Sequence, residues 1–477
     1  MSSIMMPQNM SNEVIEMFYK KSILLDSESL NIIKSKKDIL EYSKKLLQYC
    51  EKNRIYKVTT ETINSFSTTV KNSVELKIMV NNISPEGKWE KVNDAYEKYF
   101  NSRYEKIKNI INKKPSMRFT TSISTAKKRG GNVAIIAMIY SITADQSDPT
   151  KNIISMEDPT GFIKGIVNKN VYEKNPLTTD SIVGIKGSLK QNSNFITIDE
   201  IIYPGIEFKN INKTSKPMLV GFLSDIHVGS KHFLSSKWDD LVDFINNPIP
   251  MENGSKEKME AFFIAGDLVD GVGIYQNQEE DLEILEIEKQ YEKLAELIKK
   301  INPNIKIYLM PGNHDIVRPV EPQPILPKEI QEIFPENCIF ISNPSTINIE
   351  NVKILIYHGR TFDDLVGTIK DMTYSTPTIG MEYMLKSRSL LAMYGNKTPI
   401  SPLFSTWDII DSIPDIFVTG HIHYHEIVNK YNVTFINAST WQSQTAFQKM
   451  HNFNPKPCIL SLVELQSRNT YIKNFMK

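Results

Sequence analysis

The sequence predicts a multidomain α/β protein that includes an all-β part. Three observations support this fold class. The length of 477 residues suits about three domains. Apolar residues near the N-terminus follow a helical period, and two later groups of short apolar runs have the composition of strands. We expect an N-terminal helical module at 1–70, a linker at 71–116 that is basic towards its end, a small β-barrel at 117–212 and an α/β domain at 213–477.

Composition and charge exclude several classes of protein. Hydrophobic residues make up 40% of the chain, so it can bury a large core and is not disordered throughout. The formal net charge of +1 excludes a uniformly basic nucleic-acid coat. Three widely separated cysteines form no disulfide framework. We find neither a signal peptide nor an apolar stretch long enough to span a bilayer. These features predict a cytoplasmic protein without a membrane partner.

The first 70 residues are expected to fold into helices. Apolar residues such as Val14, Met17 and Phe18 recur three and four positions apart, with lysines between such groups. We interpret this module as a packing or docking domain. The next segment, 71–116, is rich in Asn, Ser and Lys and has weak periodicity, which favours a linker with some helix.

Basic residues gather where the linker meets the barrel. Between Arg103 and Arg129 there are nine Lys or Arg residues and one acid, Glu105. Such a cluster is typical of a solvated charged surface, but clustered cations also contact nucleic-acid phosphates and release counterions. The sequence leaves both interpretations open.

The segment 117–212 predicts the barrel. Its apolar runs are short, and turn residues such as Gly130-Gly131 and Asp158-Pro159 separate them. We predict strands at 133–142, 153–156, 162–167, 182–185 and 195–202. Five short strands in about a hundred residues are typical of a closed barrel of the OB type. Such barrels often bind single-stranded nucleic acid, but aromatic residues are sparse here, so packing against a partner or the next domain is equally favoured.

In the α/β domain, five apolar strands each run into a glycine or a potential ligand side chain. The predicted strands are 218–223, 262–265, 305–310, 354–357 and 416–419. Helices fit between several of them, and the clearest, Glu279 to Lys300, begins with acids and ends with lysines, as the helix dipole favours. Because ligands bind at the carboxyl ends of strands in α/β folds, we expect the functional site there.

The side chains that follow these strands form one candidate metal site. The set consists of Asp225, His227, Asp267, Asn313, His314, His358, His421 and His423. Carboxylates, imidazoles and one amide, without a thiolate, suit divalent ions such as Mn²⁺, Fe²⁺ or Zn²⁺. Seven of these residues supply two overlapping coordination spheres if one carboxylate bridges, and Asp267, directly after its strand, is the natural bridge.

Such a site favours phosphate-ester chemistry. Two cations about 4 Å apart bind a phosphate ester, lower the pKa of a water between them and neutralise charge in the transition state. His314 is left without a metal of its own, so we expect it to hydrogen-bond the phosphate or to protonate the leaving oxygen. Asp270 and Asp315 are expected to hold loops or to orient ligand histidines. The remaining histidines are expected at the surface or behind the ligands: His232, His425 and His451.

The motifs occur in a fixed order along the chain: Asp225-Ile226-His227, Gly266-Asp267-Leu268-Val269-Asp270, Gly312-Asn313-His314-Asp315, His358 and Gly420-His421-Ile422-His423. In this order they resemble the calcineurin-like metallophosphoesterase superfamily. The resemblance implies a β-sandwich flanked by helices, two divalent metal ions, and His314 as the catalytic histidine. We expect Mn²⁺, with Mg²⁺, Fe²⁺ and Zn²⁺ as alternatives. The resemblance also implies the ligands of each ion: Asp225, His227, Asp267 and His423 for one, and Asp267, Asn313, His358 and His421 for the other.

Five further stretches support a narrower resemblance over residues 118–475: DIHVGS at 225–230, EPQP at 321–324, HGRTFDDL at 358–365, YGNKTPISP at 394–402 and STWQSQTAFQ at 439–448. Together with the barrel that precedes the phosphoesterase domain, they resemble the small subunits of archaeal family D DNA polymerases. The resemblance implies a 3′–5′ exonuclease that proofreads for a separate large polymerising subunit, to which the barrel helps to bind. Its DNA partners would be single-stranded 3′ ends and primer-templates.

Two other functions stay open at this point. The same fold can serve a phosphomonoesterase or a protein phosphatase, and the chain could also be a non-catalytic scaffold subunit whose metal site is a relic. We find no convincing sliding-clamp peptide, so a contact with the clamp is left open.

Overall fold

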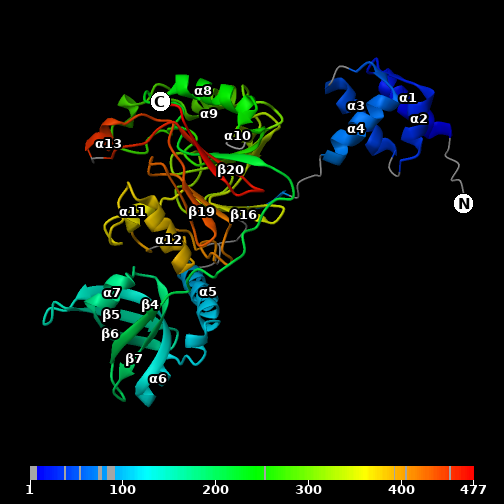
Figure 1. The fold of residues 1–477 in the computed structure, drawn as a ribbon. Coiled ribbons are helices and arrows are strands. Elements are labelled where there is room, and N and C mark those ends of the chain that lie inside the picture. The colour runs from blue at the N-terminus through cyan, green and yellow to red at the C-terminus, as the bar shows by residue number, and fades with distance from the viewer. Residues whose placement is uncertain are drawn as a thin grey trace, which may run out of the picture. The chain divides into compact units, whose positions relative to one another are not determined.

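The computed structural model in Figure 1 describes residues 8–36, 39–52, 55–72, 78–82, 92–251, 254–390, 393–402, 406–450 and 453–477. The chain divides into two units, Met1–Lys77 and Ile78–Lys477, and each is described by itself. No helix within these ranges has the length and the apolar character that crossing a membrane requires.

Helices build the first unit, as the period of its apolar residues predicts. They are α1 (Gln8–Tyr19), α2 (Ser27–Lys34), α3 (Ile39–Lys52) and α4 (Thr60–Asn72). Their shared core includes Phe18, Ile33 and Leu46. Two short parallel strands, β1 (Leu24–Leu25) and β2 (Lys57–Val58), pair with each other. The prediction of an N-terminal helical module is confirmed.

Residues 78–116 of the predicted linker belong to the second unit. They contain β3 (Ile78–Asn81), α5 (Val92–Asn112) and the beginning of a 3₁₀ turn, η1 (Pro115–Met117). β3 is the edge strand of one of the two large sheets described below. α5 is fixed by Arg103, whose side chain is 1% exposed and whose Nε lies 3.1 Å from Asp408 Oδ2. Because the buried face of α5 includes a charged residue, the apolar residues of this helix do not recur with a regular helical period in the sequence. Arg103 is therefore part of the fold, whereas the sequence placed it in a solvated or phosphate-binding cluster.

Arg103→Ala should destabilise the second unit by about 3–5 kcal/mol, because it leaves the buried Asp408 carboxylate without a counter-ion. The Tyr99 hydroxyl also donates to this carboxylate, but it carries no charge. Urea unfolding followed by tryptophan fluorescence measures the loss, since every tryptophan lies beyond residue 88. Lys108→Ala is the matched control on the same helix, because it removes only surface contacts, an ion pair with Glu105 and a contact with the Tyr104 ring, and should cost less than about 2 kcal/mol. Equal losses in the two variants would contradict this role of Arg103.

The barrel closes as predicted. Its strands are β4 (Gly131–Ala144), β5 (Lys151–Asp158), β6 (Gly161–Asn168), β7 (Ile182–Leu189) and β8 (Phe195–Ile202). They follow the order β4-β5-β6-β8-β7, and β7 pairs with β4 to complete the ring. Alternate residues of β4, such as Ile135, Ala137 and Ile139, are fully buried in the interior. Two short helices accompany the barrel: α6 (Ile123–Arg129) and α7 (Lys169–Lys174). The prediction of an OB-type barrel is confirmed.

Two six-stranded sheets form the larger part of the second unit. Their orders are β14-β13-β12-β9-β20-β21 and β18-β19-β17-β16-β15-β3. The first sheet contains β9 (Leu219–Leu223), β12 (Met259–Ala265), β13 (Lys306–Met310), β14 (Cys338–Phe340), β20 (Ile459–Glu464) and β21 (Thr470–Asn474). The second adds β15 (Ser345–Ile349), β16 (Val352–Ile356), β17 (Ile416–Thr419), β18 (Glu426–Lys430) and β19 (Val433–Asn437) to β3. β9, β12 and β13 run parallel to one another, as do β16 and β17, so their carboxyl ends share an edge in each sheet.

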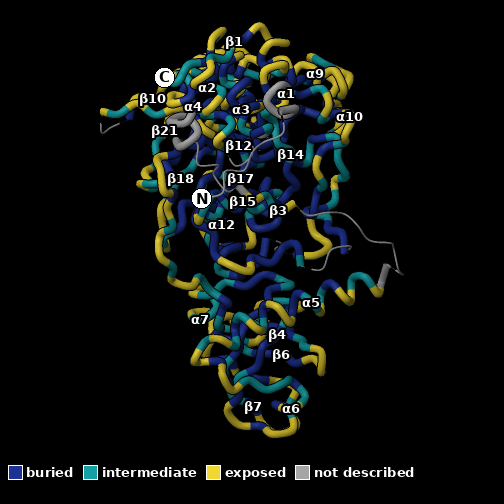
Figure 2. The backbone as a smooth tube through the Cα atoms, turned by 90° about the vertical axis from the view of Figure 1, so that its right-hand side faces the viewer, coloured by how far each residue is buried: buried dark blue, intermediate teal, exposed yellow. Residues whose placement is uncertain are grey.

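Helices cover the outer faces of the sheets, and buried side chains fill the inside. α8 (Ser235–Asn246) and α9 (Ile287–Ile298) share a core with the first sheet, and α12 (Pro377–Ser387) shares one with β17 and β19. On the opposite face of the first sheet, the rings of Phe222 and Phe263 stack with centroids 5.2 Å apart. β12 and β17 are coloured almost entirely as buried in Figure 2. The predicted β-sandwich flanked by helices is confirmed.

The helix predicted over Glu279–Lys300 is shorter in the structure, because α9 begins at Ile287. The residues before it, including the turn η2 (Gln278–Glu280), support the loop after β9 instead. Glu283 N and Ile284 N both donate hydrogen bonds to Gly229 O, so a long-range contact replaces the first helical turns. The remaining short elements are β10 (Ile249–Pro250), β11 (Lys256–Glu257), α10 (Lys328–Gln331), α11 (Phe362–Leu365) and α13 (Ala446–Met450).

Candidate metal centre

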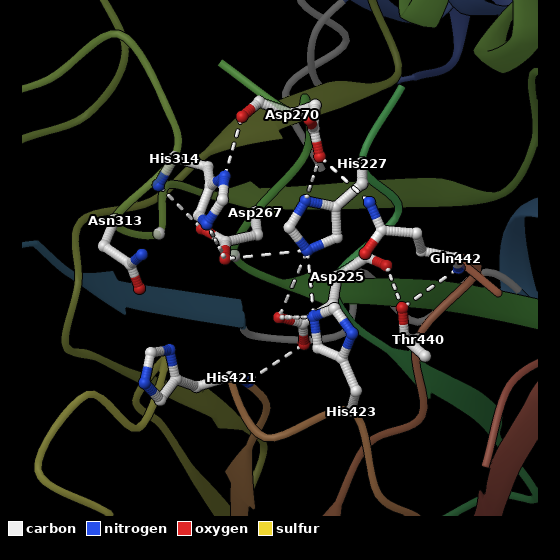
Figure 3. A network of polar contacts seen from close by, with 12 residues as sticks. Asp225, His227, Asp267, Asp270, Asn313, His314, His421, His423, Thr440 and Gln442 are labelled. Atoms are coloured by element: carbon white, nitrogen blue, oxygen red, sulfur yellow. Dashed lines mark hydrogen bonds and ion pairs between the residues drawn. The ribbon is translucent and has the colours of Figure 1, made fainter. Parts of the chain in front are cut away.

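The structure brings the eight predicted site residues together where five strands end, and Figure 3 shows most of these side chains pointing toward one another. Each loop supplies one or two of them. Asp225 and His227 follow β9, Asp267 follows β12, Asn313 and His314 follow β13, His358 follows β16, and His421 and His423 follow β17. Three of the strands belong to the first sheet and two to the second, so the site lies across the ends of both sheets.

Left-handed backbone conformations aim five of these side chains. The φ angles are 52° at Asp225, 54° at His227, 48° at Asp267, 71° at His421 and 51° at His423. Each such conformation costs about 1–3 kcal/mol for a residue other than glycine, and it persists only where surrounding contacts enforce it. Here the loop after β9 donates backbone hydrogen bonds from Asp225 N and His227 N to the loop after β12. Strain of this kind clusters at functional sites.

Asp225, His227 and His423 form the first group of ligand atoms. The Nε2 atoms of the two histidines are 2.9 Å apart, and Asp225 Oδ1 lies 3.4 Å from His423 Nε2. Asp225 is fully buried, and its other carboxylate oxygen, Oδ2, accepts a hydrogen bond from His421 N. Burial opposes ionisation of Asp225, but the hydrogen bond and charge of His423 outweigh it and hold the pKa below its ordinary value. Two imidazole nitrogens and an ionised oxygen that converge on one point fit a divalent cation.

Asp267, His358 and His421 form the second group, and Asn313 Oδ1 joins it 3.1 Å from His358 Nε2. Asp267 Oδ2 lies 3.3 Å from His358 Nε2 and 3.8 Å from His227 Nε2, so this carboxylate stands between the two groups. Burial lowers the pKa of His358, yet the charge of Asp267 raises it to about 10. The pocket therefore stabilises positive charge strongly, as a cation site must.

Residues behind the ligands hold the second nitrogen of two histidines. His227 Nδ1 lies 3.0 Å from Asp270 Oδ1, and His358 Nδ1 lies 2.9 Å from Ala265 O. Asp270 is itself held, because Gln442 donates to its Oδ1. Contacts of this kind fix the tautomer and the ring orientation of a ligand histidine and leave Nε2 for the metal.

His421 and His423 are supported by residues that the sequence analysis did not assign to the site. His421 Nε2 lies 3.0 Å from Asp363 Oδ2, so Nδ1 is the nitrogen left for a metal. Tyr374 donates its hydroxyl to the other oxygen of Asp363 at 3.1 Å. The Gln448 amide lies 2.8 Å from His423 Nδ1. Asp363 and Gln448 belong to the stretches HGRTFDDL and STWQSQTAFQ, which is the only sequence signal that could have identified them.

Asp363→Asn should weaken metal binding about 10- to 100-fold, because the amide cannot hold the His421 ring as the carboxylate does. Manganese titration of the metal-free protein, followed by calorimetry, measures the affinity. Asp371→Asn changes an exposed carboxylate nearby in the chain and should leave the affinity unchanged. If Asp363→Asn binds manganese as tightly as the wild type, the support that we assign to Asp363 is wrong.

His314 forms a third group with His227 and Asp267, whose ligand atoms also lie within 4.8 Å of one another. Its Nδ1 lies 2.7 Å from Asp270 O, and because a carbonyl only accepts, this nitrogen carries the hydrogen. Its Nε2 lies 3.9 Å from Asp267 Oδ2, and the side chain is 16% exposed. The loop is held by Asp315, whose carboxylate accepts hydrogen bonds from Gly312 N and the Tyr291 hydroxyl. Burial raises the pKa of Asp315 to about 7, and the charge of Asp267 adds to this effect.

A cavity of about 470 Å³ opens over the ligands. Its lining includes the cationic side chains of Arg360 and Lys397 and the aromatic rings of Tyr275, Tyr374 and Phe453. His425 and His232 do not line it: His425 Nε2 is buried 2.8 Å from Ser461 Oγ, and the half-buried His232 Nε2 lies 3.6 Å from Asp281 Oδ1. His451 lies outside the described residues.

The fold and the site define a metallophosphoesterase-like protein with an OB-type barrel. Residues 220–427 match the family model for the B subunits of DNA polymerases alpha and epsilon. The chain is 39% identical over 386 residues to the DNA polymerase II small subunit of Thermoplasma acidophilum, covering 80% of this chain and 78% of the relative. Against the small subunit of Methanothermobacter thermautotrophicus it is 33% identical over 475 residues, covering 93% and 96%. The chain belongs to the family of archaeal DNA polymerase II (family D) small subunits.

Solved structures align more loosely. An archaeal phosphodiesterase covers 54% of this chain and 99% of its own length at a TM-score of 0.27 and 13% identity. Vps29 of Chaetomium thermophilum covers 54% and 96% at a TM-score of 0.26 and 12% identity. At these scores the alignments add nothing to the strand order described above.

Proposed function

We propose that this small subunit is a metal-dependent 3′–5′ exodeoxyribonuclease that removes mismatched nucleotides for a large polymerising subunit. The observation that supports the proposal most directly is the position of Asp267 Oδ2, which lies 3.8 Å from His227 Nε2 and 3.3 Å from His358 Nε2. His314 Nε2 lies 3.9 Å from the same oxygen. A carboxylate between two ligand groups, with a further histidine beside it, suits the hydrolysis of a phosphodiester.

We assign the ligands of the two ions as the sequence motifs imply. Asp225, His227, Asp267 and His423 hold one ion, and Asp267, Asn313, His358 and His421 hold the other. Oxygen and nitrogen donors favour Mn²⁺, with Mg²⁺, Fe²⁺ and Zn²⁺ as alternatives. Such ions, when bound, polarise the phosphodiester, lower the pKa of a water and neutralise charge in the transition state.

Side chains of the protein itself position the substrate and donate a proton to the leaving oxygen. Arg360 and Lys397 line the cavity and attract DNA phosphates. Arg360 also donates to Pro319 O, which fixes the guanidinium at the cavity edge. His314 keeps its Nδ1 hydrogen on Asp270 O, so its Nε2, once protonated, donates to the 3′ oxygen as that oxygen leaves.

We also propose that the protein works in a heteromer. The relatives are named small subunits, which supports a larger polymerase partner. On the barrel, Tyr140 is 64% exposed and Phe162 is 39% exposed, with ring centroids 6.0 Å apart. Exposed aromatic pairs of this kind favour a protein interface. A cytoplasmic location stays a prediction, and a contact with the sliding clamp stays open.

A degradation assay tests the activity. The purified chain, alone and with its large subunit, should shorten a primer with a mismatched 3′ end one nucleotide at a time in Mn²⁺, and EDTA should stop the reaction. The phosphatase alternative predicts faster turnover of a phosphomonoester than of a single-stranded oligonucleotide. The scaffold alternative predicts no degradation under any of these conditions. Either result would overturn the proposal.

A further inference from the structure

Two aromatic side chains form one wall of the cavity. The rings of Tyr374 and Phe453 lie with centroids 4.2 Å apart and a tilt of 55°. Both side chains are half-buried, and both line the cavity that also contains His314 and His421. Pro455 lines the cavity beside Phe453. The metal assignment uses none of these rings as a ligand, so their presence over the site needs its own explanation.

Contacts between side chains place this wall on the His421 side. Tyr374 donates to Asp363, and Asp363 in turn holds His421 Nε2. His314 lies on the other side of Asp267, next to Asp270, as Figure 3 shows. The cavity therefore has two ends, one marked by His314 and the other by the aromatic pair.

The proposed reaction gives these ends different nucleotides. Cleavage at a 3′ end breaks the bond between phosphorus and the 3′ oxygen of the penultimate nucleotide. A water oxygen bonds to phosphorus, the 3′ oxygen receives a proton, and the terminal nucleotide leaves as a 5′-monophosphate. Because His314 serves the leaving 3′ oxygen, the retained strand lies at the His314 end. The terminal nucleotide then extends toward His421 and the aromatic pair.

We infer that Tyr374 and Phe453 are a stacking surface for the base of the 3′-terminal nucleotide. This inference rests on the proposed exonuclease function. An aromatic face accepts any of the four bases, so the surface imposes no sequence preference, which suits removal of any mismatched nucleotide. A correctly paired base stays stacked in the duplex, whereas an unpaired base is free to enter. Arg360 and Lys397 supply the positive charge that the backbone of such a strand requires.

A fluorescent base tests the contact without hydrolysis. The probe is a single-stranded oligonucleotide with 2-aminopurine at its 3′ end and a non-cleavable methylene phosphonate as the last linkage, in Mg²⁺. Stacking on the rings should quench the fluorescence in the wild type, and Phe453→Ala should remove the quenching and weaken binding about 5- to 150-fold. Phe453→Tyr keeps the ring and should behave as the wild type. Phe208→Ala removes a ring that is 87% exposed elsewhere and should change nothing. Quenching that persists in Phe453→Ala overturns the inference.

Cleavage of two substrates separates this inference from the proposed function. With a normal 3′-terminal base, Phe453→Ala should lower kcat/KM by the same 5- to 150-fold factor, about the loss of one base stack. With an abasic terminal nucleotide, wild type and variant should be equal, because no base is present to stack. If Phe453→Ala loses equal activity on both substrates, or loses none on either, the stacking surface is wrong, while the exonuclease proposal still stands. A wild type that cleaves neither substrate contradicts the exonuclease proposal instead.

Discussion

Asp267→Asn is expected to lower the exonuclease rate at least about 10³-fold, the largest effect of any single substitution that we foresee. Its carboxylate stands between both ligand groups, so the amide weakens both sites at once. Losing cations that stabilise the transition state by several kcal/mol corresponds to a rate loss of this size. The bound metal should fall below two ions per chain, which inductively coupled plasma mass spectrometry measures on the same sample as the rate.

A control separates this loss from unfolding. Asp240→Asn changes an exposed carboxylate of α8 that pairs with Lys237, and it should keep both the metal and the rate. The thermal unfolding of metal-free Asp267→Asn should remain cooperative, because the amide has nearly the same size as the buried carboxylate and the apolar cores of the two sheets stay unchanged. A variant that keeps two ions and the wild-type rate would show that Asp267 does not bridge.

His314→Ala is expected to lower turnover about 10²- to 10⁴-fold while both ions stay bound, because it removes the proton donor and no ligand. The decisive comparison uses two leaving groups. An oligonucleotide releases a basic 3′ oxygen that needs a proton, whereas the p-nitrophenyl ester of thymidine 5′-monophosphate releases a stable phenolate that does not. The variant should therefore lose far more activity on DNA than on the ester, as single-turnover rates would show.

The structure also defines the result that would contradict this role. His314, His227 and Asp267 offer ligand atoms within 4.8 Å of one another. If His314→Ala loses metal and is equally impaired on both substrates, His314 is a ligand rather than the acid. Gln442→Ala removes a hydrogen bond to the Asp270 carboxylate, while His314 is held by the Asp270 backbone oxygen. Gln442→Ala should therefore weaken metal binding, but it should lose equal activity on DNA and on the p-nitrophenyl ester, because His314 still protonates the leaving oxygen.

The parts of the fold that the sequence predicts correctly are those with local signals. The strands that precede Asp225, Asp267 and His421 are mostly apolar, and a serine or glycine separates each of them from its ligand residue, so both the strand and its end can be recognised. Because parallel strands align their carboxyl ends, the convergence of the side chains after them follows from topology. The strands of the barrel can likewise be recognised from the regularly spaced turns between them.

The parts that the sequence does not predict depend on contacts between distant residues. Apart from their place in the stretches HGRTFDDL and STWQSQTAFQ, nothing in the sequence distinguishes Asp363 and Gln448 from other polar residues, and they contribute to the site because His421 and His423 lie beside them. Arg103 belongs to a basic stretch in the sequence, but in the structure it is buried in an ion pair with Asp408. The late start of α9, at Ile287 instead of the predicted Glu279, has the same origin, because Glu283 N and Ile284 N donate hydrogen bonds to Gly229 O in the loop after β9.

The positive φ angles at five ligand positions have a consequence for protein engineering. Grafting the same side chains onto regular strands of another scaffold would leave them pointing away from one another, because their directions come from kinks in the main chain. A designer would have to transplant the bent loops and the pairing that keeps them bent. Replacing one of these ligands by glycine would relieve the backbone strain, but it would also remove the atom that binds the metal. At these positions the ligand side chain therefore requires a strained backbone.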